Sequence, residues 1–531
     1  MKYIKGFFVL FIAAIVLSAC AGDGSGNNNS TEPNTSDNGN GGGEDNTLTV
    51  DLASDPVSLD PHAANDGNSL YVMNAMYDTL VQMNTDLEIE PGLAESFEQI
   101  EDTVWEAKLR EGVKFHDGSE LNAEVVKANL DRVRDPDIAS PLSFLFDMIE
   151  SVEVEDEYTV HITTKYPFSA LPSHLAHPGG HMISMDLIEK SYDALDEGND
   201  PFTVVNENPI GTGYFKYKDR VNGEYVALEK NEDYWGEEAQ VDTVTFKTVP
   251  EDSARIAELK TGAADIIYPV NANDVEQINN TEGMHVKESD SASMSYLGMN
   301  NEKEPFNNVK VRQAIAMAIN KDQLIEGVLE GVPLPAKGPL APTVNGYSED
   351  TEPIEFDQDQ AKKLLEEAGY ADGFKTSILA YDRTTSDIAE NIQAQLSKIG
   401  IEAEIEMAEV GAYLEVTGNG SFDMFVGSWG TVTLDADYGL YPMFHSENAG
   451  DSGNRSFFKN DEVDSLLEQA RKSTDEAERQ KLYAEAQQII VDEATIVPLY
   501  HSVLLAGLQD SVDGFFQFPS SFPFLRDVTV E

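Results

Sequence analysis

The fold class is indicated by the stretch Glu251 to Tyr268 (EDSARIAELKTGAADIIY) together with the residues just before it. Val241 to Phe246 (VDTVTF) is rich in β-branched residues and predicts a strand. Glu251 to Thr261 predicts a helix, and Ala264 to Tyr268 predicts a second strand. Because helices that follow strands and lead into further strands are typical of α/β proteins, we predict an α/β fold.

The same mixture of patterns extends outward in both directions. Leu48 to Leu52 alternates apolar and polar residues as a strand does, so we expect the ordered protein to begin near Leu48. Gln360 to Ala368 has the spacing of an amphipathic helix. No sustained period or internal repeat is present, so the pattern favours an α/β body over a sandwich or an array.

The composition is strongly acidic. The chain has 96 Asp and Glu against 35 Lys and Arg, a formal net charge of -61, and 41% apolar residues, which suffice for large cores. This charge opposes binding to nucleic acid or anionic membranes, and no basic stripe with interleaved aromatic residues is present. A dense carboxylate surface favours solubility and suits high salt or high pH, which we treat as a hypothesis.

The N-terminal 20 residues predict export. Lys2 and Lys5 precede an apolar run from Phe7 to Leu17, which is typical of a secretory signal peptide and too short for a membrane span. The run ends in Leu17-Ser18-Ala19-Cys20, which resembles a bacterial lipobox. We therefore predict that the chain is cleaved before Cys20, so that Cys20 becomes the new N-terminus and carries acyl chains such as palmitate. The alternative is an ordinary signal peptide with an incidental cysteine.

Two further expectations follow from this segment. Residues 21–47 are rich in Gly, Asn, Ser and Asp, which predicts a disordered tether between the anchor and the folded protein. Cys20 is the only cysteine, so the folded part cannot contain disulfides, cysteine-zinc sites or a cysteine nucleophile.

An ordered set of short motifs carries a family resemblance along nearly all of the remaining chain. They are Asp55–His62 (DPVSLDPH), Tyr77–Val81, Pro91–Phe97, Trp105–Gly118, Asn208–Phe215, Asn231–Trp235 and Phe306–Asn320. Together they resemble the family 5 extracellular solute-binding proteins, the peptide- and nickel-type receptors of ABC importers. Any one of these motifs is weak, and the specificity lies in their order.

The resemblance implies a three-lobed periplasmic-binding-protein-like fold of type II, in which two α/β lobes close on a ligand and an additional lobe is inserted. By this analogy lobe I is discontinuous and consists of residues 48–77, 206–292 and 497–531. Lobe II is then formed by residues 78–205 and lobe III by residues 293–496.

Several of the motifs have an architectural interpretation of their own. Leu109 to Gly118 alternates around two glycines, which predicts a hairpin. Val311 to Ile319 has helical apolar spacing after the Asn307-Asn308 cap region, which predicts a core-facing helix. Pro209 to Phe215 lacks the Lys-Ser/Thr of a phosphate loop and predicts a glycine-containing turn near the hinge, with Tyr214 as a wall residue of the ligand site.

The segment Phe422 to Phe444 (FDMFVGSWGTVTLDADYGLYPMF) is the strongest candidate for ligand contact. It places Trp429, Asp435, Asp437 and Tyr438 on or beside a loop after an apolar strand, where carboxylates and aromatic rings suit peptide recognition. The resemblance implies that Asp437 pairs with the amine of a bound peptide. The spacing from Trp429 is longer than in oligopeptide receptors and more like that of the glutathione-binding branch, which gives Asp435 a share of this role. The alternative is a solvated acidic loop.

Cationic side chains are scarce, so each one near this segment is a candidate. Arg383 precedes a helix predicted over Asp387 to Ile399, close to where the resemblance implies a carboxylate-binding arginine. Arg455 follows the acidic loop. Each could equally be a surface ion-pair partner.

His174, His177 and His181 are the one group that suggests a metal, because three imidazoles lie within eight residues. Their spacing fits neither HExxH nor two histidines one helical turn apart, and Pro178, Gly179 and Gly180 lie between them. We therefore predict that these histidines do not form a metal site, and we keep nickel or a metal complex as the alternative cargo.

These features predict a lipid-anchored, extracytoplasmic receptor that captures di- or oligopeptides, or a glutathione-like peptide, by lobe closure. It would deliver them to a separate ABC permease with its ATPase, since the chain has no Walker motif and no second apolar span. No cofactor is expected. A secreted peptidase is the rival from another class, but the chain has no Gly-x-Ser-x-Gly elbow and no zinc-protease helix, so we do not predict an enzyme.

Overall fold

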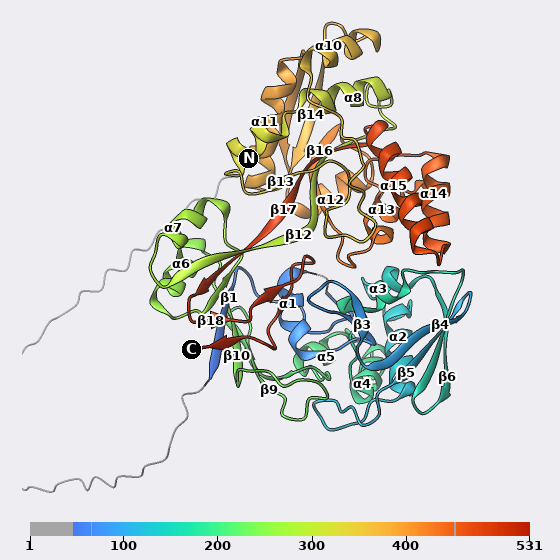
Figure 1. Ribbon diagram of the computed structural model, residues 1–531, viewed down its shortest axis with the longest axis vertical. Coiled ribbons are helices and arrows are strands. Elements are labelled where there is room, and N and C mark those ends of the chain that lie inside the picture. Colours follow the sequence, from blue (N-terminus) through green and yellow to red (C-terminus); the bar gives the residue numbers. More distant parts are fainter. Residues whose placement is uncertain (1–45, 65, 451–452) are drawn as a thin grey trace, which may run out of the picture. The chain divides into compact units, whose positions relative to one another are not determined.

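The computed structural model describes residues 46–64, 66–450 and 453–531 (Figure 1). The predicted signal peptide, the lipidation site at Cys20 and nearly all of the predicted tether lie outside these residues. The first strand, β1 (Thr47–Leu52), begins one residue before the predicted start of the ordered protein. Among the helices of the described residues, none combines the length and the apolar character that a membrane span needs.

The described residues form a mixed α/β fold around one large sheet, as predicted (Figure 1). Its strands, in spatial order, are β15 (Ile401–Met407), β14 (Phe374–Ala380), β16 (Met424–Gly430), β12 (Met284–Met299), β17 (Ile496–Gln509), β11 (Ile266–Tyr268), β1, β10 (Thr243–Thr248), β9 (Tyr225–Lys230) and β8 (Phe215–Val221), with β13 (Leu334–Pro335) on β17.

The stretch Glu251 to Tyr268 forms the predicted strand–helix–strand unit. α6 (Asp252–Thr261) connects β10 to β11, and both strands lie parallel to β1, one on each side of it. The helix ends at Gly262, whose φ of 71° is left-handed and therefore suits glycine. The α/β prediction is confirmed at the place where the local pattern was clearest.

Two long strands continue from one half of the large sheet into the other. β12 and β17 pair from Met284 and Gln509 at one end to Gly298 and Ile496 at the other, and Figure 1 shows them crossing together between the two halves. Their register shifts between Asp290 and Met294 and again at the next residues. Because a β-bulge bends a strand locally, this is where the sheet can flex.

A second, antiparallel sheet has the order β4 (Ala94–Glu101), β5 (Val104–Leu109), β7 (Thr159–Thr164) and β6 (Ile149–Asp156). The hairpin β2 (Val81–Met83) and β3 (Ile89–Pro91) precedes it. The predicted hairpin over Leu109 to Gly118 is not formed as such. β5 ends at Leu109, and Gly112 and Gly118 each have a positive φ, so each closes its own turn, with only an isolated bridge between Lys114 and Glu120.

The helices pack against these sheets. Those not yet given are α1 (Gly67–Met76), α2 (Ala123–Arg134), α3 (Leu171–Leu175), α4 (Met185–Asp196), α5 (Thr203–Glu207), α7 (Val275–Asn279), α8 (Val309–Ala318), α9 (Lys321–Val328), α10 (Gln358–Glu367), α11 (Arg383–Ser397), α12 (Val410–Gly418), α13 (Ala436–Phe444), α14 (Asp461–Lys472) and α15 (Glu476–Asp492). Short 3-10 turns are η1 (Ser143–Phe146), η2 (Pro178–Gly180), η3 (Ala272–Asp274) and η4 (Ser446–Asn448), and the C-terminal segment pairs β18 (Val512–Asp513) with β21 (Thr529–Val530) and β19 (Phe516–Gln517) with β20 (Pro523–Phe524).

Two family motifs prove to be architectural. The Asn308 side chain accepts from the backbone amide of Lys310 and caps α8, whose Val311 and Ile315 are buried, as predicted. In the turn before β8, an added Cβ at Gly211 would lie 2.2 Å from the carbonyl oxygen of Met76, so only glycine allows this close approach to α1.

The Asp55–His62 motif holds the N-terminal segment to α2. The Arg132 guanidinium lies 2.7 Å from an Asp60 carboxylate oxygen and donates to His62 Nδ1 at 2.8 Å. Both charged side chains are 0% exposed. A buried pair of this kind is costly to break, because removal of one partner leaves an unpaired charge away from water.

The buried apolar residues gather in separate clusters rather than in one core. One contains β1, α1 and the C-terminal segment, a second surrounds the antiparallel sheet, and two more lie on the β14–β16 side of the large sheet. The three lobe boundaries given above stay predictions.

Candidate functional site

Three parallel strands have their carboxyl ends toward one edge of the large sheet. β14 is parallel to both β15 and β16. Ala380 lies opposite Met407, whereas β16 pairs with β14 only as far as Leu379 opposite Phe425 and continues to Gly430. We call this the strand edge. In α/β proteins ligands bind outside the carboxyl ends of strands, because loops and helix N-termini there present polar groups.

The strand edge carries two of the predicted ligand residues. Arg383 is the first residue of α11, directly after the loop that leaves β14, and its side chain is 94% exposed. Trp429 lies near the end of β16, beside the exposed Ser428. The Arg383 Nε is 3.7 Å from Asp387, a loose surface pair that leaves the guanidinium open to a ligand.

Trp429 packs against Tyr438 of α13, which in turn contacts η1 and α3. Its Nε1 donates to the Tyr438 carbonyl at 3.2 Å, and the two rings are 5.5 Å apart. The Tyr438 ring in turn packs against Phe144 and His174, with centroids at 6.2 and 6.4 Å. We call this contact between η1 and α3 on one side and α13 on the other the α3–α13 seam.

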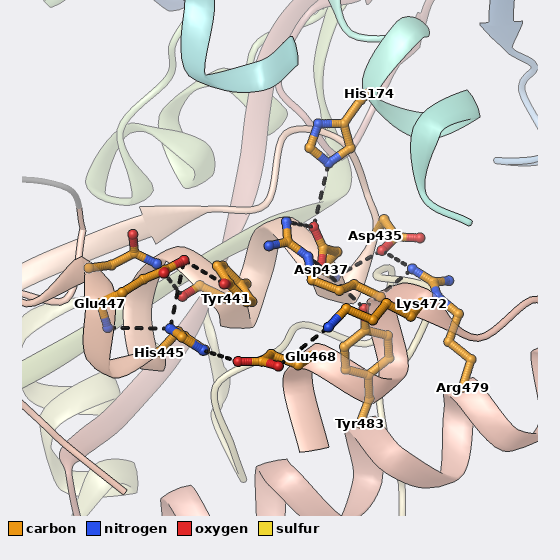
Figure 2. Close-up of polar contacts among 12 residues, drawn as sticks. His174, Asp435, Asp437, Tyr441, His445, Glu447, Glu468, Lys472, Arg479 and Tyr483 are labelled. Carbon is orange, nitrogen blue, oxygen red and sulfur yellow. Dashed lines mark hydrogen bonds and ion pairs between the residues drawn. The ribbon is translucent and has the colours of Figure 1, made fainter. Parts of the chain in front are cut away.

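Asp435 and Asp437 begin α13, and both are buried, with 2% exposure. The Asp435 side chain accepts from the Asp437 amide at 2.8 Å, so it caps the helix. It also pairs with the Arg479 guanidinium of α15 (Figure 2). Two carboxylates at a helix N-terminus are favoured by the helix dipole as well as by these partners.

Asp437 is contacted by side chains from two directions. The Arg471 guanidinium of α14 contacts its two carboxylate oxygens, each at 3.0 Å. Figure 2 shows His174 pointing toward Asp437 from α3, with Nε2 at 3.7 Å. Burial alone would raise the pKa of Asp437, but the adjacent Arg471 charge holds that pKa well below its usual range.

Arg471 also reaches across the α3–α13 seam. Its guanidinium stacks 3.6 Å from the Tyr441 ring and lies 5.6 and 5.3 Å from the rings of Tyr166 and Phe168. Its carbonyl oxygen accepts from the Ser169 amide at 3.3 Å. One arginine therefore satisfies a buried carboxylate and contacts the opposite side.

The remaining predicted residues lie apart from this group. Arg455 donates to the Leu414 carbonyl at 2.7 Å and to Thr417 Oγ1 at 2.6 Å, so its guanidinium supports the end of α12. Tyr214 is buried near the C-terminal segment, where its hydroxyl accepts from the Leu525 amide at 3.3 Å. Neither contacts the strand edge.

The three histidines predicted as an alternative metal site are all buried, with different partners. His174 Nδ1 lies 2.8 Å from the Leu145 carbonyl, the Gly179 amide donates to His177 Nδ1, and His181 stacks on Tyr77. Burial lowers the pKa of His177 and of His181 to about 3, so both rings are neutral at physiological pH. Within the residues that the structure describes, no group of three His, Cys, Asp or Glu side chains is placed to hold a metal.

The structure thus brings Trp429, Asp435, Asp437, Tyr438 and His174 together and adds Arg471 and Arg479, which sequence reasoning missed. The partners of the two aspartates lie 34 and 44 residues further along the chain, on helices whose spacing gave no sign of a site. The scarcity of cations was the only available signal.

A mixed sheet shared by two halves, with a polar strand edge and a seam of interlocking side chains, is the architecture of a periplasmic-type binding protein. The family model described as "Bacterial extracellular solute-binding proteins, family 5 Middle" matches residues 88–451, and the chain belongs to this family.

Individual relatives agree over nearly the full length. The glutathione-binding protein GsiB of Salmonella typhi is 34% identical over 484 residues, which cover 89% of this chain and 92% of that protein. HbpA2 from Haemophilus parasuis has a TM-score of 0.81 and 31% identity, covering 92% of this chain and 100% of that one. DppA from Helicobacter pylori, an ABC transporter-associated periplasmic binding protein solved in complex with the peptide STSA, has a TM-score of 0.79 and 33% identity, covering 91% and 98%.

Proposed function

We propose that this protein is the extracytoplasmic receptor of an ABC importer and that its cargo is a short peptide or a glutathione-like peptide. Family membership supports the receptor class. The cargo is suggested by the relatives, one a glutathione-binding protein and one solved with a bound peptide. In an importer of this kind the permease and the ATPase are separate chains.

The observation that carries the mechanism is the pair of strands β12 and β17. They join the two halves of the large sheet and contain the irregular register at Asp290 to Tyr296. Bending there would open and close the α3–α13 seam, and a ligand touching both sides would favour the closed form. The contacts of Tyr438 with Phe144 and His174 are those expected of a closed form.

The strand edge offers complementary groups for a peptide. The exposed Arg383 guanidinium suits a terminal carboxylate, for which a planar fork of donors is well matched. Trp429 offers an aromatic wall on the neighbouring strand β16. Backbone groups of an extended peptide would be satisfied by main-chain amides and water, which allows breadth in side chains.

The placement at the membrane rests on the N-terminal segment. Lipid on Cys20 would anchor the mature protein, and residues 21–47 would let the folded part move near the membrane surface. Export of a variant with Cys20→Ala should then release the protein into the medium or periplasm instead of the membrane fraction.

Thermal stabilisation tests the cargo. A ligand that binds only the folded state stabilises it by RT ln(1 + [L]/Kd), roughly 2.7 kcal/mol at a hundredfold excess over Kd. Equal concentrations of dipeptides, tripeptides, glutathione and nickel, with and without chelator, should give a shift with one of the peptide ligands. A shift with nickel alone, abolished by chelator, would overturn the peptide assignment.

Arg383→Ala tests the strand edge directly. We expect it to weaken binding of a peptide with a free carboxylate by about tenfold and to leave the C-terminally amidated peptide unchanged. Lys398→Ala is the matched control, because Lys398 lies at the opposite end of the same helix. Equal loss for both peptides would remove Arg383 from the ligand site.

A further inference from the structure

A cavity of about 170 Å³ lies away from the strand edge and reaches Ala176, the C-cap of α3, on its other side. It is bounded by the end of α1, the β2–β3 hairpin and the C-terminal segment around β19 and β20. None of the residues that line it comes from β12, β16 or α13. It is therefore a compartment separate from the proposed cargo site.

Aromatic rings form much of its wall. Tyr214 lies 6.0 Å from Tyr234 and 6.1 Å from Phe524, both in edge arrangements, and Phe522 also lines the space. The face of an aromatic ring is electron-rich, so a ring that turns its face to this space favours a positive charge there.

The wall contains the carboxylates of Asp78, Glu90 and Asp527 together with the side-chain amides of Asn74, Gln82 and Asn84. Asp78 accepts from Trp235 Nε1 at 2.8 Å, from Thr212 at 2.8 Å and from the Tyr234 hydroxyl at 3.2 Å. Burial raises the pKa of Asp78, so a nearby cation would favour its ionised form.

Glu90 is the second carboxylate of the wall. It accepts from the side-chain amides of Gln82 and Asn84 at 2.9 and 3.3 Å. The donors of these amides are thus directed at Glu90, and an anion entering the cavity would find few free donors.

One cation, Arg526, also lines the cavity. Its charge is offset by Asp527 and Glu237, at 2.9 and 3.2 Å, and its guanidinium lies over the Phe524 ring at 4.8 Å. Asp78 and Glu90 form no ion pair among the described residues, although the Arg526 charge acts on Asp78 in the direction that lowers its pKa. The net charge facing the cavity is therefore negative.

We propose that this cavity binds a small organic cation of the alkylammonium class. A water molecule occupies roughly 30 Å³, so the space of about 170 Å³ would hold about as much as six waters, which suits a molecule the size of choline. The rings would contact the methyl groups, and Asp78 would supply the opposite charge. Binding here would be independent of the peptide cargo.

Calorimetric titration of the full-length protein with choline tests this, with 3,3-dimethyl-1-butanol as the uncharged analogue of the same shape. Choline should bind at least about tenfold more tightly than the alcohol, and Tyr234→Leu should weaken choline by a similar factor. Tyr225→Leu is the matched control, because Tyr225 also donates to an aspartate, Asp219, but lies outside the cavity, and its effect should stay within about twofold.

Tyr234→Phe keeps the ring and should retain choline binding, which separates recognition from any loss of folding in the leucine variant. Equal affinity for choline and the alcohol would show an apolar cavity and overturn the proposal. So would the absence of choline binding at millimolar concentration. Loss of choline binding in Trp429→Ala but not in Tyr234→Leu would place the cation in the cargo site, whereas failure of the peptide titration alone would leave this inference standing.

Discussion

Arg471 is the residue whose replacement tests the site most sharply. Arg471→Met keeps much of the apolar stem but removes the guanidinium that contacts both oxygens of Asp437. The Asp437 side chain is 2% exposed and that of Arg471 12%. Because breaking a buried pair leaves an uncompensated charge, we expect a loss of ~3–5 kcal/mol in the free energy of unfolding at neutral pH.

The neighbouring Lys472 provides the control. It lies in the same last turn of α14, but its side chain is 46% exposed and pairs with the equally exposed Glu468. Lys472→Met should therefore cost about 0.5 kcal/mol or less. Urea denaturation followed by circular dichroism gives both values, and a cost for Arg471→Met no larger than that for Lys472→Met would refute the reasoning.

The pH dependence supplies an independent check. In the wild-type protein the pKa of Asp437 is depressed, so its contribution is fully present above the unfolded value near ~3.9 and is lost as the pH falls through the lower folded value. Without Arg471, burial raises that pKa instead. The difference between wild type and Arg471→Met should thus be largest at pH 7 and should shrink toward pH 3. Adding Asp437→Asn to Arg471→Met should recover part of the loss at neutral pH.

Four further outcomes are expected. Asp60→Ala should cost ~3–5 kcal/mol in urea denaturation, because it leaves the fully buried Arg132 unpaired. Burial lowers the folded pKa of His181 to about 3, so the free energy of unfolding of the wild-type protein should fall as the pH drops from ~6.5. His181→Phe should make this dependence of the free energy of unfolding on pH less steep, by up to ~1.4 kcal/mol per pH unit. Burial raises the pKa of Asp51 to about 7, so the wild-type protein loses stability as the pH rises from ~4 to 7. In urea denaturation, the free energy of unfolding of Asp51→Asn relative to that of wild type should therefore be higher at pH 8 than at pH 4, by up to ~4 kcal/mol. Asp437→Ala should weaken a peptide with a free amine more than its N-acetylated form in calorimetric titrations, because the amine role requires the ligand ammonium group to replace Arg471 at this carboxylate; equal loss for both peptides would refute the role.

The parts of the fold that could be predicted are those that depend on local pattern. The unit from Val241 to Tyr268 and the capped helix α8 form from residues adjacent in the chain, so periodicity and cap chemistry suffice. The predicted hairpin at Leu109 to Gly118 failed because two glycines with positive φ make two turns where one was expected.

The site was predicted only in part, for a physical reason. The segment with Trp429, Asp435 and Asp437 could be recognised because acidic and aromatic residues follow a strand. The arginines that neutralise these carboxylates come from α14 and α15, and ion pairs between distant segments depend on tertiary packing that no local pattern records. The amine role of Asp437 stays a prediction, and an ammonium group would have to displace Arg471 to reach it.

Different side chains set the stability of the closed form and the choice of cargo. The α3–α13 seam consists of contacts within the chain, such as those of Tyr438 with Phe144 and His174, which form without a ligand. A ligand shifts the closed population only by contacts that differ between the two forms. Since Asp437 and Asp435 are already paired, the groups left to discriminate between cargoes are those at the strand edge, above all the exposed Arg383. Changes in the Tyr438 contacts of the seam should therefore alter affinity for all cargoes by one factor, whereas changes at the strand edge should alter their order.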